Sequence, residues 1–196
     1  MLADVAIEYE IDEQNHIVAV NRAWFDEART AGDQRLADEG VVGRGLWDLI
    51  HDRNTRHLYE TIIGRARQQA RSVGFRFRCD TPDLRRLLRM EVAPIQNGHV
   101  AFAVKLVEAQ PRAAVQLLQI GRAHSDALIH MCGWCKRVKL SDDRWVEVEQ
   151  ALDALHLFEA SGPLPAISHG ICPACAETMF ALQEGEEVVF GGLPAQ

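Results

Sequence analysis

The sequence lacks the features that would direct it out of the cytoplasm or into a membrane. Its first ten residues include Asp4, Glu8 and Glu10, with neither a basic start nor an apolar run, so they do not resemble a secretory signal. No apolar stretch approaches the length that a bilayer-spanning helix needs. We therefore expect a cytoplasmic protein without a membrane segment. In that setting, paired cysteines indicate metal or redox chemistry more often than structural disulfides.

The sequence also lacks the patterns of common catalytic sites. No Ser/His/Asp constellation, phosphate-binding loop or pair of carboxylates stands out, so we expect a protein that is not an enzyme. The net charge of −7 argues against nucleic acid as a partner, because unspecific binding depends on neutralising phosphates. A local basic patch is not excluded by this balance, and a binding partner is expected to be another protein.

Four of the five cysteines form two C-x-x-C pairs, which are Cys132 with Cys135 and Cys172 with Cys175. Such a turn can point two thiolates at one ion, and two turns complete the tetrahedral S4 site that zinc prefers. Pro173 predicts a helix start beside the second pair, where free N–H groups and the helix dipole favour thiolates. We therefore predict a structural Zn²⁺ held by these four cysteines.

The role of His169, close to the second pair, stays open between two alternatives. It can hydrogen-bond a thiolate, or it can replace one cysteine as a metal ligand. Two other functions of the cysteine segment also stay open. One is a thiol switch that releases zinc on oxidation. The other is a nucleic-acid adaptor that uses four basic residues, namely Lys136, Arg137, Lys139 and Arg144.

Apolar patterns along the first half predict an α+β domain with five antiparallel strands. Strands are indicated by alternation over residues 5–11, 16–20, 73–79, 88–92 and 100–106, and a long helix by the spacing over residues 55–70. Asn21 is placed to start a shorter helix. Asn97 and Gly98 form the dipeptide that favours a tight turn between the last two strands.

This order of two strands, a helical middle and three antiparallel strands resembles a PAS domain over residues 4–108. The likeness rests on Tyr9-x-Ile11-Asp12, Ile17-x-x-Val20-Asn21 and Gly45-x-Trp47-x-x-Ile50-His51. The resemblance implies a domain that senses a small ligand or cofactor, or that mediates protein contacts. The ligand is unknown, and a homodimer stays open.

Large side chains of this segment are candidates for the interior and for a PAS-like ligand pocket. They are Trp24, Trp47, Tyr59, Phe75, Phe77, Met90 and Phe102. His57 is a candidate haem ligand, since haem-binding sensors of the PAS class carry their proximal histidine on a comparable helix; the alternative is a surface histidine. Five arginines form either a solvated face or a contact surface for an acidic partner, and these are Arg76, Arg78, Arg85, Arg86 and Arg89.

We divide the chain into a PAS-like sensor over residues 1–110, a helical connector over 111–130 and a zinc-binding module with a tail over 131–196. In the last part, a hairpin over 136–149, a short helix over 150–158 and a helix over 174–182 give the outline of a treble clef. The stretches 132–138, 145–149 and 168–175 resemble a cysteine segment found behind PAS or receiver domains in bacterial signalling proteins. We expect a non-catalytic signalling protein whose zinc module is an output or docking surface.

Overall fold

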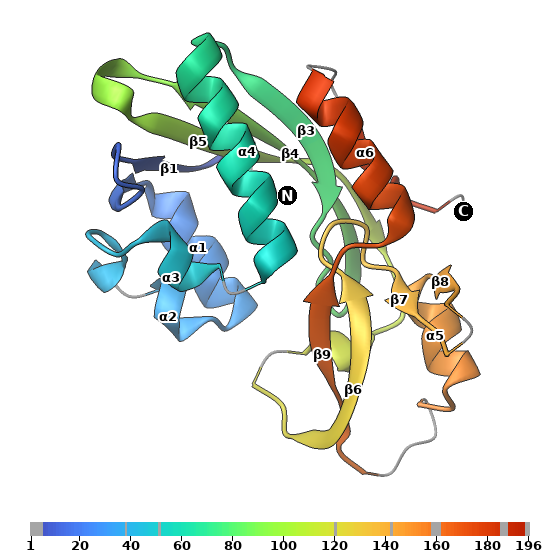
Figure 1. Ribbon diagram of the computed structural model, residues 1–196. Helices are drawn as coiled ribbons and strands as arrows, with labels where there is room; N and C mark the ends of the chain where they lie inside the picture. The colour runs from blue at the N-terminus through green and yellow to red at the C-terminus, as the bar shows by residue number, and fades with distance from the viewer. Residues whose placement is uncertain are drawn as a thin grey trace.

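A six-stranded sheet organises most of the chain (Figure 1). The computed structural model describes residues 6–37, 39–50, 52–119, 121–141, 143–157, 162–184 and 188–194. The strand order is β10-β3-β4-β5-β1-β2. The strands are β1 (Ile7–Ile11), β2 (Ile17–Val20), β3 (Val73–Arg78), β4 (Leu84–Pro94), β5 (Val100–Pro111) and β10 (Val188–Phe190).

The first five of these strands are antiparallel neighbours, whereas β10 joins β3 in parallel. The prediction of a five-stranded, wholly antiparallel sheet is therefore wrong at one edge. The three residues of β10 are too few to show a period, and their partner strand lies far away in the sequence. Register between such distant segments is decided by packing rather than by local pattern.

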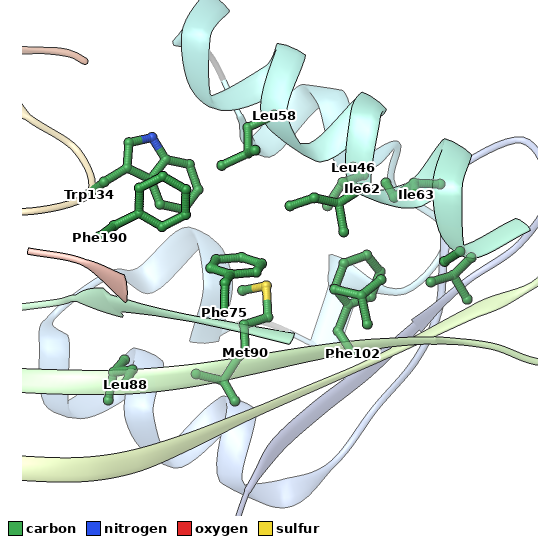
Figure 2. Close-up of a cluster of buried hydrophobic side chains, with 14 of the residues drawn as sticks. Leu46, Leu58, Ile62, Ile63, Phe75, Leu88, Met90, Phe102, Trp134 and Phe190 are labelled. Atoms are coloured by element: carbon green, nitrogen blue, oxygen red, sulfur yellow. The ribbon is translucent and has the colours of Figure 1, made fainter. Parts of the chain in front are cut away.

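Helices cover one face of this sheet. They are α1 (Arg22–Ala31), α2 (Gln34–Ala37), η1 (Glu39–Val41), α3 (Leu46–Leu49) and α4 (Arg53–Gln69). The side chains of Asn21 and Asp52 accept hydrogen bonds from the N–H groups of Trp24 and Thr55, at 3.1 and 2.6 Å, and so cap the starts of α1 and α4. The buried residues of α4 recur at helical spacing: Leu58, Ile62, Ile63 and Ala66. Figure 2 shows Leu58, Ile62 and Ile63 on the side of the helix that faces the sheet.

The helical connector predicted over residues 111–130 is wrong. Over residues 112–119 and 121–123, which the structure describes, the only helical element is a short 3₁₀ turn, η3 (Gln116–Leu118), and the strand β6 (His124–Cys132) follows. Gly121, with φ of +78°, interrupts any helix there. The strand forms because β6 pairs in parallel with β9 (Leu164–Gly170), a partner that the local pattern does not reveal. The division of the chain into three segments stays a prediction.

A second, smaller sheet has the order β8-β7-β6-β9. The predicted hairpin is present as β7 (Val138–Lys139) and β8 (Trp145–Val146), whereas the short helix predicted over residues 150–158 lies earlier, as α5 (Val148–Ala154). The helix α6 (Pro173–Glu184) begins at the proline that predicted it. A small core lies beneath this sheet, formed by Val115, Leu117, Met131, Val138, Leu140, Val148, Ala151, Leu152 and Leu164.

None of the helices in the described ranges is long and apolar enough to cross a membrane.

Candidate metal centre

The four cysteines of the two C-x-x-C pairs come together in the structure. Cys132 ends β6 and Cys135 lies on the following turn, while Cys172 precedes α6 and Cys175 lies in its first turn. Their sulfur atoms all lie within 4.8 Å of one another. The four side chains are no more than 3% exposed, and all four are free thiols.

The spacing of the sulfur atoms suits a metal ion better than a disulfide. The Sγ atoms of Cys135 and Cys172 are 3.6 Å apart. A disulfide needs about 2.05 Å. Two sulfurs that each lie about 2.3 Å from one tetrahedral zinc are about 3.8 Å apart. The four-sulfur donor set thus fits a metal ion that prefers thiolates, of which zinc and iron are the usual examples.

Mutual hydrogen bonds change the acidity of these thiols. Bonds from Cys135, and then from Cys172 and Cys175, lower the pKa of Cys132. Bonds from the other three thiols, that of Cys132 first, raise the pKa of Cys175. The backbone N–H groups of Cys172 and Cys175 also donate to Sγ of Cys132 and Cys172, each at 3.5 Å. Four thiolates in this space repel one another, so a cation is needed to ionise the whole set.

The turn that carries the first pair is tied to both sheets. The N–H of Arg78 on β3 donates to the carbonyl of Trp134 at 2.8 Å, and the N–H of Gly133 donates to the carbonyl of Gly170 on β9 at 2.9 Å. Lys136 adopts φ of +61°, which turns the chain back toward β7. The ligand positions are therefore held by backbone contacts to β3 and β9.

The C-terminal strand also contacts this turn. Gly191, directly after β10, has φ of +67°, and a Cβ at this position would lie 2.3 Å from the Cβ of Cys135. Only glycine fits so close an approach with this backbone. Sequence reasoning missed this residue, although a Gly191–Gly192 pair after three apolar residues signals a turn beside a short strand.

His169 lies outside the four-sulfur group. Its side chain is exposed on β9, and within the described residues no hydrogen bond joins it to a thiol. Partial desolvation, and then the positive charge of Lys136, lower the pKa of His169. The structure thus leaves the imidazole of His169 outside the donor set.

The seven large side chains proposed for the interior and for a PAS-like pocket differ in how deeply they are buried. Phe75, Met90 and Phe102 are buried, whereas the other four are half-buried. The guanidinium of Arg56 lies over the ring of Trp47, 5.0 Å from its centroid. Trp24 meets Tyr9 edge-on at 5.2 Å.

Four aromatic side chains, three of them among the seven proposed pocket residues, surround a residue that the sequence analysis did not propose for the interior. The indole of Trp134, which is 4% exposed, lies between α4 and β3. Its ring centroid is 5.1 Å from that of Phe190, 5.8 Å from that of Phe75, 6.0 Å from that of Phe77 and 6.5 Å from that of Tyr59. In Figure 2, Trp134 and Phe190 lie side by side near Phe75, with Leu58 of α4 opposite. The cysteine turn therefore contributes to the main core.

His57 does not face this interior. Its side chain is exposed on α4, next in sequence to the fully buried Leu58. A haem ligand for the interior would have to lie on the buried face of the helix.

Two surface hollows lie beside the large sheet. One of about 490 Å³ is lined by Glu8, Glu10, Glu91 and several alanines, and also by Tyr9 and Phe102 of the aromatic core. Another of about 450 Å³ lies between α1 and the ends of β1, β4 and β5.

Buried ion pairs join the large sheet to the cysteine segment. Arg78, fully buried, bonds to Asp80 and to Glu147, the residue before α5. Arg85 and Arg112 both bond to Glu149. Three of the five arginines predicted on an outer face thus contact acidic side chains of the same chain: Arg78, Arg85 and Arg86, the last through Glu27. Buried charges of this kind require such partners.

No protein-family model matches this chain, and comparison with the curated proteins gave no match either.

Proposed function

We propose that this chain is a non-catalytic cytoplasmic regulatory protein with a PAS-like sensor domain and a structural zinc module that acts as an output or docking surface for another protein. The order of two strands, helices and three antiparallel strands supports the PAS-like reading. The order of turn, hairpin and second cysteine pair at a helix start supports the treble-clef reading of the module. Four free thiols are in keeping with the cytoplasm.

One observation carries the proposal: Trp134 packs inside the sensor domain while its sequence neighbours form the metal centre. Cys132 and Cys135 lie on the same short turn as this indole. A change in the position of the turn therefore moves a ring that contacts Phe75 and Phe77 on β3. This direct contact is the route that we propose for coupling between the two parts.

The buried ion pairs give a second link. Arg78 follows Phe77 on β3, and its backbone N–H holds the carbonyl of Trp134 while its guanidinium holds Glu147. A shift of β3 thus acts on both the cysteine turn and the start of α5. Because the pairs are buried, such a shift has to keep them together or leave a charge unpaired.

The two rival functions have less support. The sulfur atoms of a thiol switch should be accessible to oxidant, whereas these four cysteines are at most 3% exposed. The basic residues of a nucleic-acid adaptor should be free to reach phosphates. Instead, Lys136 donates to the carbonyl of Gly133, Arg137 pairs with Glu147 and Lys139 pairs with Asp143.

Zinc affinity tests the coupling without knowledge of the partner. We expect Phe77→Leu to weaken zinc binding roughly fivefold, because losing about 1 kcal/mol of packing around Trp134 destabilises the metal-bound turn. Val100→Ala, a truncation at a buried position of β5 that pairs with Ile11, is the matched control. Competition with a chromophoric chelator measures both. Equal zinc affinities in the two variants would show that the sensor interior and the metal centre are independent.

The docking role needs a partner, and crosslinking can identify one. Leu128 on β6 is 64% exposed and therefore suits a photo-crosslinking amino acid. In cells, we expect one protein to be crosslinked at this position. The yield should be lower when the chain carries Phe77→Leu than when it does not. A yield that is independent of Phe77 would contradict the proposed route.

A further inference from the structure

The position of Trp134 in the sensor domain has the properties of a ligand site. Four aromatic rings surround the indole, contributed by α4, β3 and β10. Phe75 and Phe77 meet it edge-on, at interplanar angles of 65° and 71°. Phe190 and Tyr59 lie at 41° and 37° to it. Edge-to-face and tilted contacts on several sides are the arrangement that aromatic pairs prefer, so this space selects a flat, two-ring shape.

The indole N–H donor lacks a hydrogen-bond acceptor in this space. Nε1 of Trp134 is buried, and among the described residues it has no hydrogen-bond partner. A buried donor without an acceptor lowers the stability of the state that contains it. A flat ring system that lacks the N–H group would fill the space equally well without this loss.

Attachment to the metal turn explains why the indole is the occupant. Trp134 lies between Cys132 and Cys135, so a metal ion bound by both cysteines fixes the turn from which the ring projects. A tethered group has an effective concentration of about millimolar or more, which excludes a free ring present at micromolar concentration. Without the metal, the turn keeps its backbone bonds to Arg78 and Gly170 but loses the ligand bonds.

We propose that the space between α4, β3 and β10 is a binding site for a planar, apolar, two-ring aromatic molecule. Trp134 is its tethered occupant while the metal centre is loaded, and loss of the metal opens the site to a free molecule of this class. This inference rests on the proposed function in taking the first domain as a sensor and zinc as the resident metal. It assigns the ligand class of that sensor and makes ligand binding and metal binding mutually exclusive.

Titration of the full-length chain with naphthalene and with indole tests the proposal. The zinc-loaded Trp134→Ala protein should bind one equivalent of either probe, and naphthalene at least as tightly as indole, because the indole N–H finds no acceptor. Zinc-loaded wild type should bind at least about tenfold more weakly, since the tethered ring competes. Wild type freed of zinc by a chelator should bind like the variant. Calorimetry measures stoichiometry and affinity.

Trp145→Ala is the matched control, because Trp145 lies on β8 of the same segment and has no ring contact with Trp134 among the described residues. Its zinc-loaded form should behave like wild type. If Trp134→Ala does not fold, Trp134→Leu takes its place. This variant leaves a smaller opening at the same position, and benzene is then the probe.

Three results would overturn the proposal. A folded, zinc-loaded Trp134 variant that binds no ring would show that the space closes. If zinc-loaded wild type bound the probe as tightly as Trp134→Ala, or if Trp145→Ala were the only variant that bound it, the probe would bind at another place. Failure of folded, zinc-free wild type to bind would remove the control by metal. None of these results depends on the zinc-affinity difference between Phe77→Leu and Val100→Ala, so the two proposals fail separately.

Discussion

Replacing Gly191 with alanine should damage the metal centre from the far end of the chain. A Cβ at Gly191 would lie 2.3 Å from the Cβ of Cys135 and 3.0 Å from its Cα, and the backbone has φ of +67°. The left-handed backbone costs an alanine about 1–2 kcal/mol. The overlap adds about 1–3 kcal/mol, because backbone rather than a flexible side-chain end has to move. The free energy of unfolding should fall by about 2–5 kcal/mol in total.

A second glycine separates the two contributions. Gly32, at the end of α1, has φ of +75°, and among the described atoms nothing lies within 4 Å of an added Cβ. Gly32→Ala should therefore cost only the backbone term of about 1–2 kcal/mol and leave zinc affinity unchanged. Gly191→Ala should lose more stability and also bind zinc more weakly, since Cys135 is a candidate ligand.

Urea unfolding of the zinc-loaded proteins and competition with a chromophoric chelator measure the two quantities. The reasoning is refuted if both variants lose the same stability and bind zinc as wild type does. That result would mean that the residue after β10 does not lie against the cysteine turn.

Two further perturbations address the buried polar groups. Arg78→Met should lower the free energy of unfolding by about 3 kcal/mol. This is the low end for a broken buried ion pair, because Arg112 still contacts Asp80. Denaturant unfolding measures the loss, and a value below about 1 kcal/mol would indicate that the pair is solvated. Burial raises the pKa of Tyr59 from 10.0 to about 12. The unfolded chain therefore loses this proton first as the pH rises, so stability should be full below pH 10 and decline up to about pH 12. Tyr59→Phe should make that decline shallower, and an unchanged pH profile would contradict the burial of the hydroxyl.

Local signals in the sequence predicted the elements that depend on neighbouring residues. Asn21 and Pro173 mark the starts of α1 and α6, because a capping side chain and a fixed φ act within one turn. Asn97 and Gly98 adopt φ of +59° and +73°, the left-handed values that their turn requires. Alternation marked β5, where Val100, Phe102 and Val104 are buried and the residues between them are less so. The C-x-x-C spacing indicated which sulfur atoms could meet.

The helix predicted over the connector was wrong because the structure of this segment depends on residues that are distant in the sequence. Two of its apolar residues, Val115 and Leu117, are buried in the small cluster beneath β6 and β7 rather than on a connector helix. The choice between helix and strand was made by β9, which adds backbone hydrogen bonds along β6. No local pattern reports a parallel partner that lies many residues later.

The sequence alone determined the fold class, the caps and turns, and the four cysteines that can share an ion, because each depends on residue types at short separations. Tertiary structure decided that β10 closes the edge of the large sheet and that Gly191 lies on the cysteine turn. It also placed Arg78 against Glu147, and Trp134 between α4 and β3. These arrangements join segments that are distant in the chain. Only the burial of a shared core makes their pairing favourable.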